Sequence, residues 1–203
     1  MININEMNFS KLNGLIPAII IDTNTKQILM LGFMNEESIK RTFEIGRLTF
    51  FSRTKNKLWT KGETSGNYLE LVSIISDCDN DTLLIEAYPH GNTCHTGAFS
   101  CFNIQKDNTY FLSQLFDLIQ KRKNEMPENS YTTSLFKEGT DRIIQKVGEE
   151  SIETVIAAKN RNREELINET SDLIYHLFVM LADQNISLAD VIENLELRHR
   201  TQN

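Results

Sequence analysis

The strongest constraint on the fold is a change of sequence pattern near residue 106 of the 203-residue chain. Before this point, short apolar runs are separated by Gly, Asp and Asn. After it, apolar residues recur every three or four positions over longer stretches. The first pattern is typical of strands and the second of amphipathic helices. We therefore predict an α+β protein with a mostly-β, metal-binding N-terminal domain over residues 1–106 and an all-α domain over residues 107–203.

The apolar runs give the expected elements of each half. The first half should contain strands over residues 16–21, 27–33, 48–52, 69–75 and 82–88, with the first two forming a hairpin. A helix over residues 36–44 should begin after Asn35 as its N-cap. The second half should contain helices over residues 111–124, 141–159 and 164–184, and one more that starts after Ser187.

Composition excludes several classes of protein. The chain has 21 Lys and Arg against 28 Asp and Glu, and this acidic balance argues against a nucleic-acid-binding surface. Its apolar runs fall far short of the roughly 20 residues that a membrane helix needs, and the polar N-terminus does not resemble a signal peptide. Three cysteines, an odd number, do not suggest a disulfide framework. We expect a cytoplasmic protein with no membrane or nucleic-acid partner.

Two short segments carry the residues with the most metal chemistry. Residues 77–81 read Asp-Cys-Asp-Asn-Asp, and residues 94–102 begin with Cys-His and end with Ser-Cys-Phe. Three thiolates suit zinc and leave its fourth position for water. On an extended strand, alternate residues share a face, so the three carboxylates would gather a hard cation such as Mg²⁺ or Ca²⁺. The alternative is a set of small buried cysteines and an ordinary Asp-rich turn. The candidates are Cys78, Cys94, Cys101, Asp77, Asp79 and Asp81.

The segment 58–67 contains two glycines, which let backbone N–H groups approach an anion closely. Basic and hydroxyl side chains in and near it add donors suited to a phosphate. A solvated glycine-containing turn is the alternative. The candidate phosphate-binding residues are Arg53, Thr54, Lys61, Gly62, Ser65, Gly66 and Asn67.

Two predicted helices carry paired carboxylates. Glu150 and Glu153 lie three residues apart on one helix, and Glu169 and Asp172 on the next, so each pair shares a helix side. Facing pairs of this kind can hold Mg²⁺ against the phosphates of a substrate. A solvated acidic surface is the alternative. The helix around Asp172 is apolar nearly all round, so we expect that carboxylate to be buried, with His176 one turn later as a structural partner.

Taken together, the motifs resemble two known enzyme families. Residues 51–54, 58–67, 77–81 and 94–102 are similar to phosphoribosyl-AMP cyclohydrolases. Residues 130–132, 146–150 and 175–176, with Glu153, Glu169 and Asp172, are similar to phosphoribosyl-ATP pyrophosphohydrolases. The order and length of the two halves resemble the fused, bifunctional family of histidine biosynthesis.

The resemblance implies two reactions. The C-terminal half would hydrolyse phosphoribosyl-ATP to phosphoribosyl-AMP and pyrophosphate, with Mg²⁺ held by Glu150, Glu153, Glu169 and Asp172. The N-terminal half would open the adenine ring of phosphoribosyl-AMP by attack of a zinc-bound hydroxide at carbon 6.

The same resemblance implies ligands and partners for the N-terminal half. Zinc would be bound by Cys78, Cys94 and Cys101 at the interface of a homodimer, with Cys78 supplied by the partner chain. Mg²⁺ would be bound by the three aspartates. Lys61 and His95 are the candidate catalytic residues, although His95 is equally suited to a structural role beside the zinc.

Two other functions remain open on the residues alone. The chain is also compatible with a non-catalytic zinc module, closed by His95 or His90 as fourth ligand and fused to a helical dimerisation domain. A nucleotide pyrophosphohydrolase that clears ordinary nucleoside triphosphates, with an accessory domain, is the second alternative.

Overall fold

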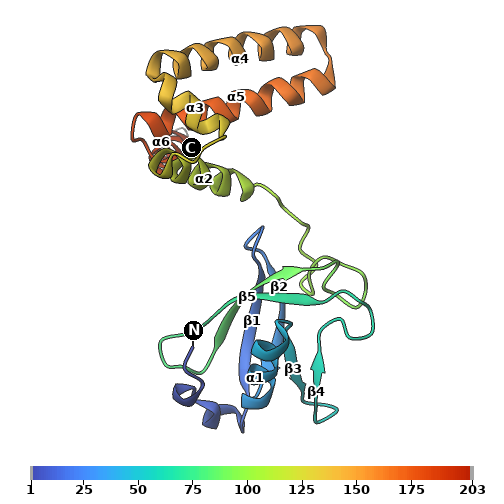
Figure 1. Cartoon of the computed structure of the whole chain (residues 1–203). Helices are drawn as coiled ribbons and strands as arrows, with labels where there is room; N and C mark the ends of the chain where they lie inside the picture. Colours follow the sequence, from blue (N-terminus) through green and yellow to red (C-terminus); the bar gives the residue numbers. More distant parts are fainter. Residues whose placement is uncertain (1, 202–203) are drawn as a thin grey trace. The chain divides into compact units, whose positions relative to one another are not determined.

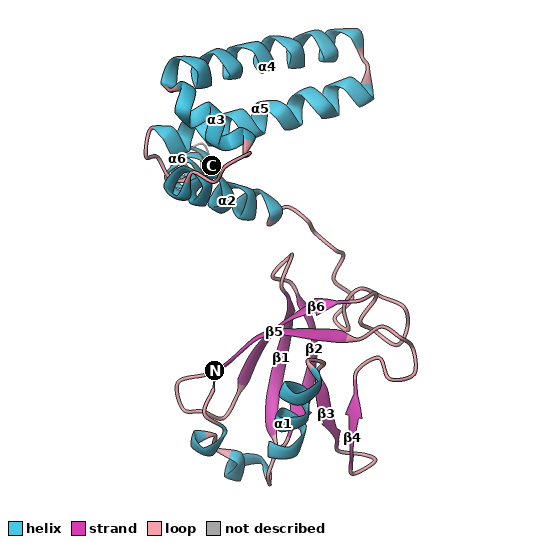
Figure 2. Cartoon of the chain, viewed as in Figure 1, coloured by secondary structure: helices cyan, strands magenta, loops and turns pink. Residues whose placement is uncertain are grey.

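The structure, a computed structural model, describes residues 2–201 and contains two compact units that meet at Phe111 and Leu112. The first unit is built mainly of strands and the second only of helices, which confirms the predicted α+β class (Figures 1 and 2). The domain boundary that we place at residues 106 and 107 stays a prediction. None of the helices in the described part of the chain combines the length and apolarity needed to cross a membrane.

A four-stranded sheet forms the centre of the first unit, in the order β2-β1-β6-β5. The expected hairpin of β1 and β2 is present, β1 and β6 run parallel, and β5 and β6 run antiparallel. As a result β6 is an inner strand, with the segment of residues 77–82 before it and the cysteine-containing loop after it. The strands are β1 (Ile16–Asp22), β2 (Ile28–Met34), β5 (Leu69–Ser76) and β6 (Leu83–Pro89).

A helix and a small hairpin complete this unit. Helix α1 (Glu36–Ile45) begins at Asn35, which forms the expected cap as part of a capping box with Ser38. Strands β3 (Thr49–Ser52) and β4 (Lys57–Thr60) pair antiparallel. The sequence did not indicate β4, because a four-residue strand of mixed polarity leaves no alternating pattern to detect.

The core of the first unit follows from strand alternation. Ile16, Ala18 and Ile20 of β1 are fully buried, as are Leu83, Ile85 and Ala87 of β6. Gly32 of β2 leaves room for the ring of Phe50, since a Cβ at this position would lie 2.4 Å from the Cδ1 atom of that ring. Trp59, the only tryptophan of the chain, packs against the same core.

The second unit consists of helices, with α4 and α5 lying antiparallel side by side (Figure 2). Ser187 forms a capping box with Asp190, as expected for the last helix. Helix α3 was not predicted, because two turns are too short to show a helical period clearly. The helices are α2 (Phe111–Glu125), α3 (Tyr131–Glu138), α4 (Thr140–Asn160), α5 (Arg163–Asp183) and α6 (Leu188–Arg200).

Replacement of Ile85 by Ala should destabilise the first unit by about 2–5 kcal/mol, because it removes buried methylene groups from an inner strand. Urea unfolding followed by Trp59 fluorescence reports on this unit alone. Leu84→Ala is the matched control: its side chain is 37% exposed on the opposite face of β6, so its cost should be much smaller. Equal losses for the two variants would contradict this assignment of the core.

Candidate functional site

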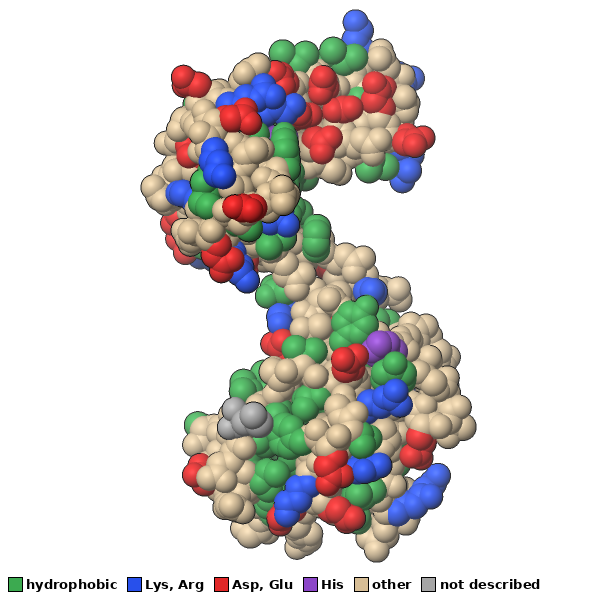
Figure 3. Space-filling view, viewed as in Figure 1, with side chains coloured by type: hydrophobic (Ala, Val, Ile, Leu, Met, Phe, Trp, Pro, Cys, Tyr) green, Lys and Arg blue, Asp and Glu red, His purple; other side chains and the backbone are tan. Residues whose placement is uncertain are grey.

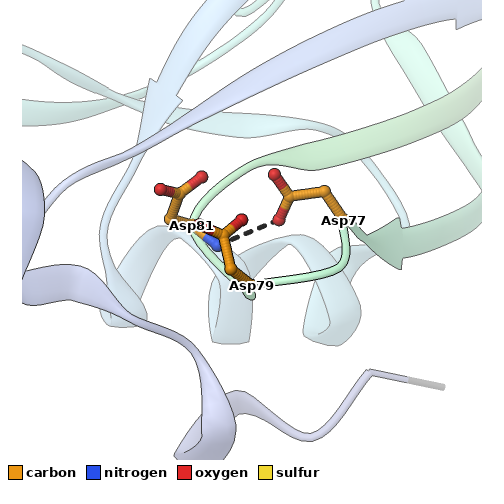
Figure 4. A group of neighbouring side chains, drawn as sticks. All are labelled: Asp77, Asp79 and Asp81. Atoms are coloured by element: carbon orange, nitrogen blue, oxygen red, sulfur yellow. Dashed lines mark hydrogen bonds between the residues drawn. The ribbon is translucent and has the colours of Figure 1, made fainter.

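The carboxylates of Asp77, Asp79 and Asp81 converge in a turn directly after β5. One oxygen of Asp77 accepts a hydrogen bond from the backbone N–H of Asp81, at 3.0 Å (Figure 4). The same oxygen accepts a second one from the backbone N–H of Thr82, at 3.1 Å. Asn80, with a φ of 58°, reverses the chain. One ligand oxygen from each of the three aspartates lies within 4.8 Å of the others. The prediction that strand alternation gathers them is therefore wrong: the strand ends at Ser76 and a turn does so.

A lysine from a distant segment already neutralises part of this turn. Lys11, in a short 3₁₀ helix over Phe9–Leu12, places its ammonium 2.5 Å from a carboxylate oxygen of both Asp79 and Asp81. These hydrogen bonds hold the pKa of Lys11 well above its ordinary value and lower that of Asp81. The donor set contains only oxygen atoms, which fits a hard cation that displaces or joins Lys11.

Cys94 and Cys101 lie together in the loop that follows β6. The backbone N–H of Cys101 donates to the carbonyl oxygen of Leu29, at 2.8 Å, which anchors the loop to β2. The Thr96 hydroxyl donates to the Cys94 sulfur at 3.1 Å and lowers the pKa of that thiol, which favours the thiolate that binds metals. Partial burial, followed by the neighbouring Cys94, raises the pKa of Cys101.

Cys78 does not join this pair within one chain. It lies in the turn before β6, whereas the other two cysteines follow that strand. Seven residues of strand span about 20 Å. All three thiols are free, and among residues 2–201 no cluster of potential metal ligands contains Cys78 with the other two. One chain thus brings together two of the three predicted zinc ligands.

His95 follows Cys94 directly, and its Nδ1 atom lies 3.8 Å from the Cys94 sulfur. Its imidazole is exposed. His90, the other histidine that could complete a closed zinc site, has its Nε2 atom 2.8 Å from a carboxylate oxygen of Glu70 and stacks on the ring of Tyr68 at 4.1 Å. His95 is therefore the histidine next to the cysteine pair, and its role stays a prediction.

The glycine-containing segment forms a tight turn after β4. The backbone N–H of Gly66 donates to the Gly62 carbonyl oxygen at 2.8 Å, and Gly62 has a φ of 85°. The positive charge of Lys61 partly opposes the rise in the pKa of Cys101 that burial and Cys94 cause, which places this lysine near the cysteine pair. Thr60, Lys61 and Gly62 line one side of a pocket of about 370 Å³.

The other side of this pocket was not predicted from the sequence. It is lined by Arg41 and Arg47, which flank the end of α1, and by Tyr68, whose ring lies 4.0 Å from the Arg47 guanidinium carbon. Their proximity to Lys61 depends on tertiary packing, and only their charge is visible in the sequence. Arg53 and Thr54 lie in the β3–β4 turn, at the opposite end of the hairpin from Lys61.

The helical unit brings together carboxylates from two helices. Oxygens of Glu150 on α4 and of Glu169 and Asp172 on α5 lie within 4.8 Å of one another. Glu153 is outside this tight group. Burial, followed by the charge of Glu153 and then those of the other carboxylates, raises the pKa of Glu169. This mutual repulsion fits a site that a divalent cation would stabilise.

Burial within this group differs from our expectation. Asp172 is exposed, and Glu150 is the buried member, at 5% exposure. The prediction of a buried Asp172 is wrong because its side of α5 faces solvent beside α4. His176 is buried, and its Nε2 atom lies 3.9 Å from the Glu150 carboxylate, while its Nδ1 atom has no hydrogen-bond partner among residues 2–201.

Basic side chains lie next to these carboxylates on α4. The Lys146 ammonium is 2.6 Å from an oxygen of Glu150 and 3.0 Å from one of Glu149, and Arg142 lies 3.7 Å from Glu149. Figure 3 shows acidic side chains gathered over α4 and α5, with a group of Lys and Arg side chains beside them. The arrangement offers a metal-binding group and an anion-binding group in one place.

Comparison with known proteins identifies the family to which each unit belongs. Residues 30–103 match the family model of phosphoribosyl-AMP cyclohydrolase, and residues 112–199 match that of phosphoribosyl-ATP pyrophosphohydrolase. Among curated relatives, the histidine biosynthesis bifunctional protein HisIE of Bacteroides thetaiotaomicron is 55% identical over 96% of both chains. The protein of the same name from Escherichia coli is 54% identical over 96% of both chains. That of a Buchnera aphidicola subspecies is 55% identical over 95% of this chain and 89% of its own.

Replacement of Gly62 by Ala should destabilise the first unit strongly. At this left-handed φ, a Cβ atom would lie 2.4 Å from the backbone nitrogen of Tyr68, which has no room to move away. Gly66→Ala is the control: its φ of 77° is equally unfavourable, but no atom lies within 4 Å of the added carbon. We expect a loss of about 1–2 kcal/mol for Gly66→Ala and a clearly larger one for Gly62→Ala. Urea unfolding followed by Trp59 fluorescence measures both, and similar values would contradict the crowding at Gly62.

Proposed function

Because this chain belongs to the family of bifunctional histidine-biosynthesis enzymes that join a phosphoribosyl-AMP cyclohydrolase to a phosphoribosyl-ATP pyrophosphohydrolase, we propose that its two candidate sites act in succession. The helical unit hydrolyses phosphoribosyl-ATP between its α- and β-phosphates. The mostly-β unit then opens the adenine ring of the phosphoribosyl-AMP that results. The observation that carries this proposal is the difference between the two ligand sets. The mostly-β unit contains all three thiols of the chain, two of them near Lys61, beside an acidic turn, whereas the group in the helical unit consists of carboxylates alone.

In the helical unit, Glu150, Glu169 and Asp172 are the proposed Mg²⁺ ligands, with Glu153 beside them. Bound Mg²⁺ would neutralise phosphate charge and orient the attacking water. Water oxygen forms a bond to phosphorus, the bond to the pyrophosphate oxygen breaks, and the water proton is taken up by a base. Burial and then the neighbouring carboxylates raise the pKa of Glu169, and a bound cation would reduce the repulsion within this group.

In the mostly-β unit, Cys94 and Cys101 are proposed zinc ligands, with Cys78 of a second chain as the third. Zinc held by three thiolates would lower the pKa of a bound water and so supply hydroxide near neutral pH. The oxygen is added at carbon 6 of the purine, and the bond from nitrogen 1 to carbon 6 breaks as nitrogen 1 gains the electron pair. His95, exposed beside Cys94, is suited to move the proton.

The substrate of this step carries two phosphates, one on each ribose. We propose that Lys61 with the backbone of residues 62–67 holds one phosphate, since this turn lies near the cysteine pair. Arg53 and Thr54, at the other end of the hairpin, would hold the second. The acidic turn of Asp77, Asp79 and Asp81 is the proposed Mg²⁺ site of this unit.

A homodimer with shared zinc sites is supported by two observations. Cys78 lies at the opposite end of β6 from the other cysteines, so a second chain has to bring its own Cys78 to the pair. Apolar side chains of β5, the strand that precedes Cys78, are also uncovered: Val72 and Ile75 are 51% and 55% exposed. On α4, Ile152 and Val155 are 64% and 68% exposed. Surfaces of this kind commonly mark an interface.

We also propose that the protein acts in the cytoplasm, because three free thiols suit a reducing compartment.

The proposed function can be tested by separating the two steps in the full-length chain. Wild type should convert phosphoribosyl-ATP to pyrophosphate and the ring-opened product, while Cys101→Ser should stop at phosphoribosyl-AMP and lose bound zinc. Glu169→Gln should release little pyrophosphate yet still process added phosphoribosyl-AMP. Glu164→Gln, in the exposed first turn of α5, is the control and should behave as wild type. Chromatography of products and zinc analysis provide the readouts. Rapid turnover of ordinary nucleoside triphosphates, or zinc retained in Cys101→Ser, would contradict the proposal.

The shared zinc site makes a second prediction, on mixed dimers. Cys78→Ser and Cys101→Ser homodimers should both lack cyclohydrolase activity, because every zinc site misses one thiolate. A heterodimer of the two variants contains one intact site, so random mixing should restore about a quarter of the wild-type activity. Mixing wild type with the double variant Cys78→Ser/Cys101→Ser in equal amounts gives a reference for random exchange. With shared sites, random exchange should reduce this reference to about a quarter of the wild-type activity, whereas sites built within one chain should leave about half. Co-expressed single variants that remain inactive beside a reference at about one half would contradict the shared site.

A further inference from the structure

Lys146 forms an ion pair with Glu150, one of the proposed metal ligands of the helical unit. Its ammonium lies 2.6 Å from Oε1 of Glu150, the buried member of the helical carboxylate group. A second bond, at 3.0 Å, joins Lys146 to Glu149. The Lys146 side chain is only 18% exposed, so this ion pair is well shielded from solvent. In the structure, Glu150 is therefore neutralised by a cation that belongs to the chain itself.

The basic and acidic groups follow one another along a single side of α4. Arg142, Lys146 and Glu150 are spaced four residues apart, which places them on the same helix side. The carboxylates of α5 lie beside Glu150, at one end of this row. A polyphosphate ester presents negative groups in a similar row. It can therefore lie with one phosphate at the carboxylate end and the others along Lys146 and Arg142.

A divalent cation and the Lys146 ammonium compete for the carboxylate of Glu150. Two positive groups cannot both lie within bonding distance of it without strong repulsion. When the divalent cation binds Glu150, the Lys146 ammonium loses its shorter ion pair. The longer one, to Glu149, balances only part of the positive charge of Lys146. A released ammonium in a poorly solvated position favours the nearest anion, and on our proposed function that anion is the phosphate chain of the substrate.

We propose that Lys146 is an exchangeable cation: it holds Glu150 in the absence of metal, and it binds the pyrophosphate portion of the substrate once a divalent ion has taken its place. Arg142, one turn earlier and 3.7 Å from Glu149, extends the same anion site. The inference rests on the proposed function of the helical unit. It adds a substrate-binding residue and an order of events, because metal binding prepares the site for the triphosphate.

The test compares Lys146→Met with wild type in the full-length protein, using Mn²⁺ as the metal probe and inorganic pyrophosphate as the ligand probe. Mn²⁺ binding without pyrophosphate, followed by electron paramagnetic resonance, should become about 3–10-fold tighter because the competing cation is gone. Pyrophosphate binding at saturating Mn²⁺, measured by calorimetry, should weaken about 10–100-fold, since one charged hydrogen bond is lost. Lys146→Arg should keep most of the pyrophosphate affinity.

A structural role for Lys146 gives a different result. If the lysine only positions Glu150, its loss should weaken Mn²⁺ binding as well, and this outcome overturns the proposal. Unchanged pyrophosphate affinity also overturns it. Lys159→Met, an exposed lysine in the last turn of the same helix, is the matched control. Conversion of added phosphoribosyl-AMP by the mostly-β unit shows that the variant protein is folded. If Lys146→Met is unstable, Lys146→Gln replaces it in both binding measurements. A wild type that does not cleave phosphoribosyl-ATP refutes the proposed function instead.

Discussion

Repulsion between like-charged ligands is the constraint on which both sites depend. Three carboxylates within 4.8 Å of one another are unfavourable unless the fold supplies compensating groups. In the acidic turn, backbone N–H groups compensate Asp77, and Lys11 compensates the other two aspartates. On the helices, Lys146 compensates Glu150, while burial and then repulsion from Glu153 and the other carboxylates raise the pKa of Glu169. Each cluster is thus gathered with a lysine as an internal counter-ion.

The arrangement of strands and helices determines which potential metal ligands of one chain lie close together. Strand β6 is an inner strand with Cys78 before it and Cys94 and Cys101 after it, so the rigid sheet that positions these residues also keeps Cys78 away from the pair. The helical site is different, because α4 and α5 lie side by side and bring three carboxylates together within one chain. The zinc site that we propose, with all three thiolates, therefore requires association of two chains, whereas the proposed carboxylate site does not.

The sequence predicted the elements whose residues repeat with a clear period. The strands that became β1, β2, β5 and β6 and the long helices α4 and α5 were expected within a few residues, whereas the short elements β4 and α3 were not. Strand alternation was the wrong explanation for the acidic turn, since the order of residues does not reveal where a strand ends and a turn begins. Helix periodicity likewise misjudged Asp172, because the number of apolar neighbours says little about which side the next helix covers.

The ligand types could be identified from the sequence, but their partners could not. Lys11 meets Asp79 across a sequence separation of 68 residues. Arg47 lies at the pocket of Lys61 because the segment after α1 pairs with its neighbours: Arg47 forms a β-bridge with Glu70, and the Lys61 N–H donates to the carbonyl oxygen of Leu48. Such contacts come from tertiary packing and leave no local pattern. Metal ligands are restricted to a few residue types, whereas almost any nearby Lys or Arg can balance their charge. The groups that compensate a site, and so control when a metal can enter it, are therefore the part that only the structure reveals.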